Sequence, residues 1–473
     1  MIADDHRRAL VALLGPDNVL WEDGDRVSYE SGARFDRGRA ALILRPRDTQ
    51  TVSAAVSYCV KHDIAIVAQG GNTGVVSGST PDDTGEQVVL SLDRLTQRFE
   101  LDRENRSLRV DAGFLLSDVN GRLAEHGLQF PIDLGADPRL GGMLSTNTGG
   151  SRFLRYGDVR QNVLGITVVL ADENGTVLDL MSGLRKNNTG VDWKHIFIGT
   201  VGAFGIITEC ELNLEPLPLQ VATALLVPRD GAAVMRLLAA MERQLGSYLS
   251  AFEGMSGNAI DAALVHVPSL RNPFSNGETA PYAILAEVSR DWPIRKGEQS
   301  LDLVLETVLA EIWESDDAPL ADAFVGPPQE LWALRHALSE GVKASGRLVG
   351  FDLSFRRGDV IRFCDHMKET LPERYPGIRI CDFGHICDGG VHFNLVLPAE
   401  TTFDAAAEQA LRAYVYGTAV ESFGGSFSAE HGIGRKNQAF YDRYTSDHRR
   451  ALADGLKQLT SPARLGTVRF GSA

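Results

Sequence analysis

Several features that would place this chain in a common functional class are scarce or absent from its 473 residues. Its five cysteines show no CxxC spacing, which argues against an iron–sulfur cluster or zinc knuckle and fits a reducing compartment. No window approaches the apolar length of a membrane-spanning helix. The formal net charge of -15 argues against nucleic acid as a partner, because binding phosphates requires a basic surface. No basic stretch precedes an apolar one at the N-terminus, so we expect a cytoplasmic protein.

The chain is too long to fold around one ordinary hydrophobic core, so we expect two or three domains. From about Ala40 to Leu217, short β-rich runs alternate with glycine-rich turns, and longer strand and helix patterns follow. From about Thr401 the pattern is mostly helical. We therefore predict a cofactor domain over residues 1–217, an α+β substrate domain over 218–400, and a helical segment over 401–473 that completes the site.

Local patterns predict individual elements within these domains. The pair Asn174-Gly175 in ITVVLADENGTVLDL predicts a hairpin with a type I′ turn. Apolar residues at helical spacing predict helices over 301–313 and 328–344, the second beginning at a pair of prolines. The remaining clear elements are a strand over 41–46, a helix over 48–63 capped by Asp48 or Thr49, a strand over 64–69, and a strand over 281–289.

Two glycine-rich segments could hold a cofactor that carries phosphates. The first, QGGNTG at 69–74, follows a buried strand pattern, and the second, GGMLSTNTGG at 141–150, sets small hydroxyl residues between paired glycines. Glycine lets backbone amides approach a ligand closely. Neither segment fits the GxGxxG fingerprint, which argues against a Rossmann NAD domain. Taken alone, each could equally be a set of tight turns in a β-rich domain.

The segment CDFGHICDGGVHFNLVLP carries the most chemistry. Strands over 381–386 and 391–397 around Asp388-Gly389-Gly390 would set His385 directly opposite His392. Directly opposed residues share a face with Cβ atoms about 5 Å apart, close enough for two imidazoles to bind one cation. Asn394 lies two residues further on and projects from the same face.

A third ligand is offered by the adjacent pair Glu430 and His431 in a glycine-rich segment. Two histidines and one glutamate, with positions left open for substrate, form a catalytic arrangement for zinc-like ions, and manganese or iron would also be tolerated. The alternative is that each histidine is a hydrogen-bonded polar residue in a sheet. The combination of two opposed histidines with a Glu-His pair favours the metal.

The order of these segments resembles a known family of flavoproteins. QGGNTG, then PIDLGADPRLGGMLSTNTGGSRFLRYG, then LRKNNTGVDWKHIFIGTVGAFGIITE is similar to the FAD domain of the vanillyl-alcohol-oxidase-type enzymes, nearest to the D-2-hydroxyglutarate and D-lactate dehydrogenases. HICDGGVH resembles the family pattern HxGDGNxHxN, and SAEHGIG matches SAEHGxG. The resemblance spans about Ala40 to Gly434. It implies an α+β fold with an FAD-binding domain of the p-cresol methylhydroxylase (PCMH) type and a ferredoxin-like substrate domain.

The resemblance also implies where FAD binds. Relatives with covalent FAD often attach it through a histidine, and QGGNTG has none, so we expect non-covalent FAD. The positions expected to contact it are Gln69, Gly70, Gly71, Asn72, Thr73, Gly74, Ser77, Pro131, Gly141, Gly142, Ser145, Thr146, Gly149, Gly150, Gly205 and Ile207.

The same resemblance places metal ligands at His385, His392 and Glu430, and substrate contacts at Asn394 and His431. Arg335 and Ser339 lie four residues apart on one face of the helix over 328–344, where an arginine and a hydroxyl bind the far end of the substrate. A solvated surface arginine is the alternative for Arg335. Gly350 stands where a lysine is expected, in GFDLS, and this departure leaves the identity of the acid open.

We therefore expect a dehydrogenase that oxidises a D-2-hydroxy acid, such as D-2-hydroxyglutarate, to the 2-oxo acid. The divalent ion, zinc in the first instance, would act as a Lewis acid, His431 as the general base, and flavin N5 as the hydride acceptor. Electrons would pass to an external acceptor such as an electron-transfer flavoprotein or a quinone. The alternatives are a D-lactate or glycolate dehydrogenase, and a flavin electron-transfer subunit without a substrate. A homodimer is left open.

Overall fold

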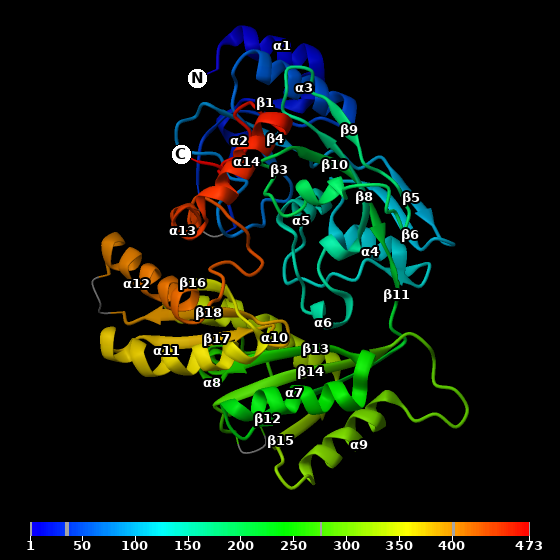
Figure 1. Cartoon of the computed structure of the whole chain (residues 1–473), viewed down its shortest axis with the longest axis vertical. Coiled ribbons are helices and arrows are strands. Elements are labelled where there is room, and N and C mark those ends of the chain that lie inside the picture. The colour runs from blue at the N-terminus through cyan, green and yellow to red at the C-terminus, as the bar shows by residue number, and fades with distance from the viewer. Residues whose placement is uncertain (1, 34–36, 275–276, 400–402, 473) are drawn as a thin grey trace. The chain divides into compact units, whose positions relative to one another are not determined.

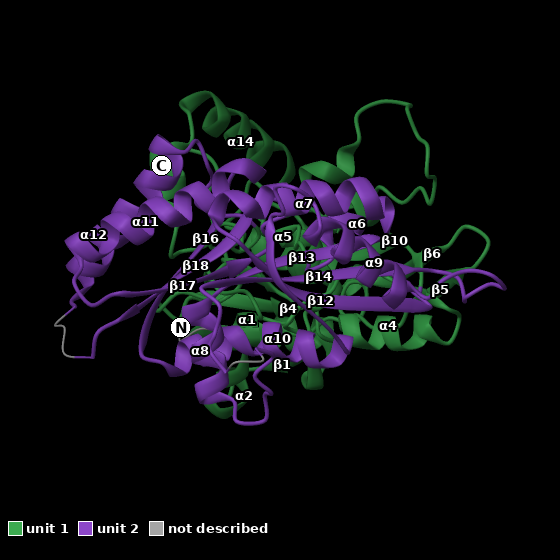
Figure 2. Ribbon diagram, turned by 90° about the horizontal axis from the view of Figure 1, so that it is seen from below, with its two compact units in different colours: residues 1–149, 158–216, 430–473 green, residues 150–157, 217–429 purple. Residues whose placement is uncertain are grey.

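The computed structural model describes residues 2–33, 37–274, 277–399 and 403–472 (Figure 1). Two compact units account for the chain (Figure 2). The first comprises residues 1–149, 158–216 and 430–473, and the second comprises 150–157 and 217–429. The chain therefore leaves the first unit for eight residues before returning to it, and the segment predicted as helical over 401–473 divides at residue 429.

The first unit begins with a four-stranded sheet of order β1-β2-β4-β3. Its strands β2 and β3 run parallel to β4, and β1 runs antiparallel to β2. The helix over 49–61 is fixed at its start by a capping box, because the Asp48 carboxylate accepts from the Thr51 amide while the Thr51 hydroxyl accepts from the Asp48 amide. The elements are α1 Asp4–Leu14, β1 Val19–Leu20, α2 Asp23–Glu30, β2 Ala40–Leu44, α3 Thr49–Lys61, β3 Ile66–Gln69 and β4 Gln87–Ser91.

A second, antiparallel sheet in the first unit has the order β5-β6-β10-β8-β9. Its apolar face packs on residues such as Phe130, Leu140 and Leu144 to form a buried core. The elements are β5 Phe99–Asp102, β6 Ser107–Asp111, α4 Leu116–Ala124, β7 Leu128–Gln129, α5 Leu140–Thr146, β8 Val163–Val169, β9 Val177–Asp179, β10 Ile206–Asn213, β11 Glu215–Pro216, α13 Gln438–Tyr444 and α14 Asp447–Thr460.

The hairpin predicted around Asn174-Gly175 is confirmed as β8 and β9, but the type I′ turn is wrong. A type I′ turn needs positive φ at both central residues, and of this pair only Gly175 has one, at +59°. The Asp172 carboxylate instead accepts from the amides of Asn174 and Thr176. The longer loop is organised by this side chain rather than by a two-residue turn.

The second unit is built on a seven-stranded antiparallel sheet of order β15-β12-β14-β13-β17-β18-β16. Helices α8 and α10 pack on one face with a shared apolar core, and α7, α9 and α11 cover the other (Figure 1). The elements are α6 Phe153–Tyr156, β12 Gln220–Pro228, α7 Gly231–Leu245, β13 Leu249–Ser256, α8 Gly257–His266, β14 Tyr282–Arg290, α9 Leu301–Trp313, β15 Leu320–Gly326, α10 Pro328–Ala344, β16 Arg347–Ser354, α11 Val360–Arg374, β17 Arg379–Gly384, β18 Gly390–Leu397 and α12 Ala405–Gly417.

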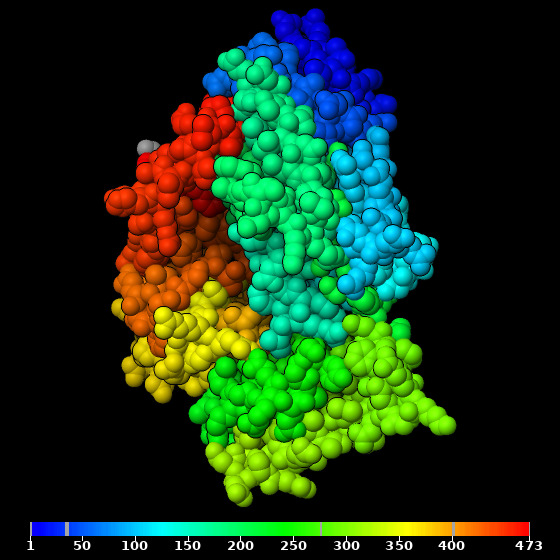
Figure 3. Space-filling view, turned by 45° about the vertical axis from the view of Figure 1, so that its right-hand side comes forward, coloured from blue at the N-terminus to red at the C-terminus, as the bar shows by residue number. Residues whose placement is uncertain are grey.

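The structure confirms the α+β fold and the two predicted helices, which are α9 and α10 with the predicted bounds. Helix α9 lies at the surface of the second unit, in the yellow-green part of Figure 3, and exposes Leu303 and Trp313. All five cysteines are free and buried. Among the described residues, no helix has the length and apolar character needed to cross a bilayer.

Candidate functional site

The hairpin of β17 and β18 carries both predicted imidazole ligands, but its register differs from the prediction. His392 pairs with Phe383, two residues before His385. The shift is by an even number of residues, so His385, although one residue beyond the end of β17, stays on the side of His392. The two imidazole ring centroids are 5.7 Å apart.

The register differs because the turn is longer than predicted. His385 lies beyond the end of β17, and its carbonyl accepts from the amides of Asp388 and Gly390. Gly389 has φ +97°, and a Cβ there would stand 2.1 Å from the Phe355 carbonyl oxygen. Glycine at this position therefore lets the turn pack against a neighbouring backbone.

A buried carboxylate, which the sequence had not singled out, lies behind His385. Glu253 of β13 is fully buried, and its Oε1 lies 2.7 Å from His385 Nδ1. Its Oε2 accepts from Nε of Arg335 at 2.8 Å and forms an ion pair with Nη2, also at 2.8 Å. Burial raises the pKa of Glu253, but His385 and Arg335 outweigh it and lower that pKa to about 2. Glu253 is therefore an anion that holds two cation-forming side chains.

A second carboxylate lies beside His392. Asp352 of β16 pairs with His392 in the sheet, and its Oδ1 lies 3.8 Å from His392 Nδ1. Its Oδ2 accepts from the Ala429 amide at 2.9 Å. Glu430 and His431 are the next two residues in the chain after Ala429. The hydrogen bond from Ala429 therefore keeps the backbone of this pair near the Asp352 carboxylate.

Asp352, His392, Glu430 and His431 each offer one ligand atom, and these four atoms lie within 4.8 Å of one another. Two imidazoles with two carboxylates form a donor set that suits Zn²⁺, Mn²⁺ or Fe²⁺. Two of the three predicted ligands are in this group, and His385 lies beside it with its ring edge-on to that of His392. Asp352 was missed, although its place in GFDLS, on the strand paired with His392, is the signal that could have found it.

The predicted substrate contacts fall into different environments. Asn394 is 6% exposed, lies opposite Gly350 in the sheet, and donates to the His392 carbonyl at 3.2 Å. Arg335 is 8% exposed and paired with Glu253, so it is not the solvated surface arginine that was the alternative. Ser339 is exposed on the same helix.

The two glycine-rich segments of the first unit come together, as a shared cofactor site requires. A Cβ on Gly70 would lie 3.3 Å from the Gly142 nitrogen, and one on Gly71 would lie 3.3 Å from the Arg139 nitrogen. Around Gly74 and Gly142, no heavy atom of the described residues comes within 4 Å of such a Cβ, apart from chain neighbours and their own helix. The open space at these two glycines fits a cofactor whose phosphates are held by backbone amides.

Side chains of the predicted cofactor positions mainly fix these loops. Gln69 is buried and donates to the carbonyls of Tyr29 and Ser79. The Ser145 and Thr146 hydroxyls donate to carbonyls of their own helix, α5. Asn72 and Ser77 have positive φ, at +52° and +64°. The other predicted positions are half-buried at Thr73, and buried at Pro131, Gly141, Gly149, Gly150, Gly205 and Ile207.

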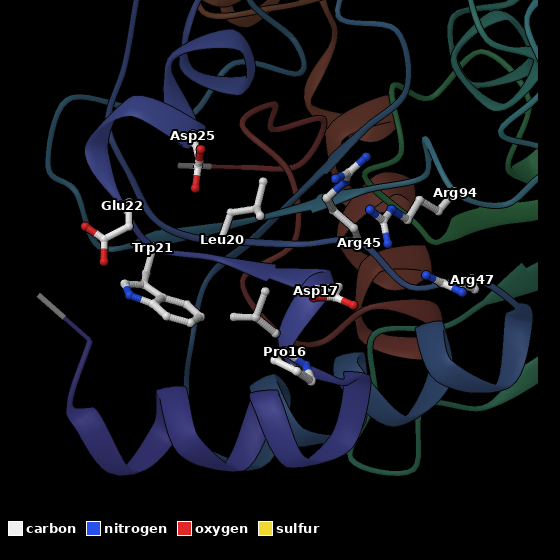
Figure 4. A pocket seen from close by; sticks show the side chains of 10 residues that line it. Pro16, Asp17, Leu20, Trp21, Glu22, Asp25, Arg45, Arg47 and Arg94 are labelled. Atoms are coloured by element: carbon white, nitrogen blue, oxygen red, sulfur yellow. The ribbon is translucent and has the colours of Figure 1, made fainter.

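A pocket of about 490 Å³ opens elsewhere in the first unit (Figure 4). Arg45, Arg47 and Arg94 lie on one side of it and are matched in number by Asp17, Glu22 and Asp25. Its lining residues include no predicted site residue. We therefore place the candidate active site at the hairpin rather than in this pocket.

Comparisons with known proteins find two matched families along the chain. Residues 40–181 match the family described as FAD binding domain, and residues 217–465 match the FAD linked oxidases, C-terminal domain. Two solved structures share the fold at 17% identity. They are p-cresol methylhydroxylase with substrate bound, with a TM-score of 0.72 over 97% of this chain and 94% of that one, and alkyldihydroxyacetonephosphate synthase, with 0.73 over 98% and 85%.

Curated relatives are more similar in sequence. The mitochondrial D-2-hydroxyglutarate dehydrogenase of Arabidopsis thaliana is 32% identical over 456 residues, which cover 95% of this chain and 78% of the relative. That of Bos taurus is 34% identical over 457 residues, with the same coverage. The D-2-hydroxyglutarate dehydrogenase of Xanthomonas citri pv. viticola is 33% identical over 428 residues, 89% of this chain and 86% of that one.

The matched domains define an FAD-dependent oxidoreductase, and its fold is shared with p-cresol methylhydroxylase. Within that class, the chain belongs to the FAD-dependent D-2-hydroxyglutarate and D-lactate dehydrogenase family. The resemblance stated from the motifs is confirmed.

Proposed function

We propose that the protein oxidises a D-2-hydroxy acid to the corresponding 2-oxo acid, with non-covalent FAD and a divalent cation held by His385, His392 and Glu430. The observation that carries this proposal is the cluster of ligand atoms from Asp352, His392, Glu430 and His431 within 4.8 Å, which holds two of the three proposed ligands and the proposed base. The third proposed ligand, His385, lies beside His392 with ring centroids 5.7 Å apart. The names of the relatives support a 2-hydroxy dicarboxylic acid as the substrate. An electron-transfer subunit would have no use for such a donor set.

Bound FAD would supply the hydride acceptor, and a bound divalent cation would lower the pKa of the substrate hydroxyl. The His431 imidazole would take up the hydroxyl proton at a ring nitrogen, since histidine is the commonest general base in enzymes. Asn394, which projects from the same face of β18 as His392, would orient the substrate carboxylate with its side-chain amide. Arg335, with Ser339 one turn further along α10, would bind the far end of the substrate.

A smaller or more apolar 2-hydroxy acid, such as lactate or glycolate, is the second candidate. It is favoured by Gly350, which lies directly opposite Asn394 and brings no cation to this face of the sheet. It is also favoured by the pairing of Arg335 with Glu253, because the carboxylate already balances the guanidinium charge.

Steady-state kinetics on a panel of D- and L-2-hydroxy acids, with an artificial electron acceptor, tests the proposal. We expect turnover of the D-acids alone, with kcat/KM ranking the dicarboxylic against the shorter acids. A flavin-loaded protein that turns over none of them would contradict it and favour the electron-transfer subunit.

The physiological acceptor and the cellular location extend the proposal. We propose an external acceptor, an electron-transfer flavoprotein or a quinone, for the second half-reaction. A cytoplasmic location stays a prediction, supported by five free cysteines, which fit a reducing compartment.

A further inference from the structure

Two glutamates on neighbouring strands of the second unit are almost completely buried. Glu253 lies on β13 and Glu287 on β14, at 0% and 1% exposure. Each forms a pair with an arginine: Glu253 with Arg335, and Glu287 with Arg152 through Nε and Nη2 at 2.8 and 2.9 Å. Burying a carboxylate is costly unless charged donors surround it, so each glutamate is held by specific partners.

The two glutamates differ in their remaining partners. Glu287 accepts from the Ser250 hydroxyl at 2.7 Å and from the Trp332 indole at 2.7 Å, both of them neutral donors. Glu253 instead lies 2.7 Å from Nδ1 of His385. The partners of Glu287 described above include no predicted ligand, whereas Glu253 joins a predicted metal ligand to a predicted substrate contact.

The Glu253 contact settles which nitrogen of His385 faces outward. Nδ1 is the ring nitrogen that contacts Glu253 at 2.7 Å, so Nε2 is the nitrogen left to bind a cation. A carboxylate in this position also fixes the orientation of the ring and makes the imidazole a stronger ligand. The opposite oxygen, Oε2, fixes the plane of the Arg335 guanidinium through Nε and Nη2.

We propose that Glu253 is a positioning residue that holds His385 ready for the metal and Arg335 ready for the substrate, so that one buried carboxylate couples the two ends of the site. This inference rests on the proposed function for the role of Arg335. Its claim about His385 concerns metal affinity and can be measured without a substrate.

The experiment titrates the purified flavoprotein, stripped of metal, with Co²⁺ and follows the visible d–d absorption. In Glu253→Gln, we expect the Kd for Co²⁺ to rise about 10- to 100-fold, the range typical of a lost carboxylate behind a histidine ligand. The matched control is Glu287→Gln, which removes the same charge from an equally buried glutamate that is also paired with an arginine. It should lower the melting temperature and leave the Kd for Co²⁺ unchanged.

Equal Kd values for Glu253→Gln and the parent would overturn the proposal, as would an equal rise in both glutamine variants. Glu253→Asp keeps the charge with a shorter reach and serves if the glutamine variant does not fold; an unchanged Kd there would also overturn it. Kinetics separate the two proposals. Glu253→Gln should also raise KM for the hydroxy acid. A parent enzyme without turnover would contradict the proposed function. Weaker Co²⁺ binding by Glu253→Gln would still support the role of Glu253 toward His385 in that case.

Discussion

The candidate sites of the two units are built from different parts of the chain, backbone amides in the first unit and side chains in the second. In the first unit, Gly70, Gly71 and Gly142 bring backbone amides together, and the side chains of Gln69 and Ser145 hold the loops in shape. In the second unit, side chains provide the chemistry, since imidazoles project from one strand hairpin onto carboxylates of β13 and β16. A site built from backbone amides can be recognised from a short stretch of sequence. A site built from side chains depends on which strands become neighbours in the fold.

The largest expected effect is the loss of turnover, without loss of flavin, when a predicted metal ligand of the second unit is removed. His392→Ala removes a ligand and should lower kcat by roughly 1,000-fold, the equivalent of several kcal/mol of Lewis-acid stabilisation of the transition state. Its flavin content, measured as the ratio of absorbance at 450 to that at 280 nm, should match the parent. Loss of flavin together with activity would show that the two sites are not independent.

A substitution in the glycine-rich segment 69–74 of the first unit should weaken FAD binding. Gly70→Val puts a Cβ 3.3 Å from the Gly142 nitrogen and adds two methyl groups to it, and overpacking of about 1–3 kcal/mol should weaken FAD binding by roughly 5- to 100-fold. Equilibrium dialysis of FAD measures this. Gly121→Ala is the control, because it lies in α4 with open space at its Cβ position. An unchanged FAD affinity in Gly70→Val would remove this loop from the cofactor site.

A variant in the segment 150–157 tests whether charged contacts of this segment stabilise the second unit. Arg155 pairs with Asp291 at 2.9 Å and also donates to Ser289, and the side chain of Arg155 is 14% exposed. Arg155→Met should lower the free energy of unfolding by about 1–3 kcal/mol, because it leaves polar partners without their charged donor. Urea denaturation monitored by circular dichroism measures it. Unchanged stability would show that this segment is held by its apolar contacts alone.

The smallest effect concerns pH and the first unit. Burial, and then the Asp93 carboxylate, raise the pKa of Tyr29 to about 12. The folded state therefore retains this proton more tightly than the unfolded chain, whose tyrosines ionise near pH 10. The resulting stabilisation is present below pH 10 and is lost as the pH rises towards 12. Tyr29→Phe should make the melting temperature fall less steeply over that range, and an identical slope in the two proteins would contradict this.

Much of the fold and part of the site follow from sequence pattern. Helices α9 and α10 follow from apolar spacing, and α3 from its capping residues, because these signals lie within one element. The face of His385 also follows from the period of a strand. Its register does not, because the turn at Gly389 depends on contact with the Phe355 backbone.

The residues that sequence reasoning missed are those defined by distant partners. Glu253 lies 132 residues from His385 and Asp352 lies 77 residues from Ala429, so no local pattern relates them. Arg335 was predicted as a substrate contact from its place on the helix. Its pairing with Glu253 appears only once β13 and α10 are packed together.

The most direct test of the metal-assisted reaction is anaerobic mixing of the flavoprotein with a D-2-hydroxy acid that it turns over, before and after the metal is removed. The metal-loaded protein should lose its absorbance at 450 nm as the flavin is reduced. The stripped protein should keep that absorbance until Zn²⁺ or Mn²⁺ is added back. Flavin reduction at the same rate in the stripped protein would contradict a role for His385, His392 and Glu430 in holding a catalytic ion.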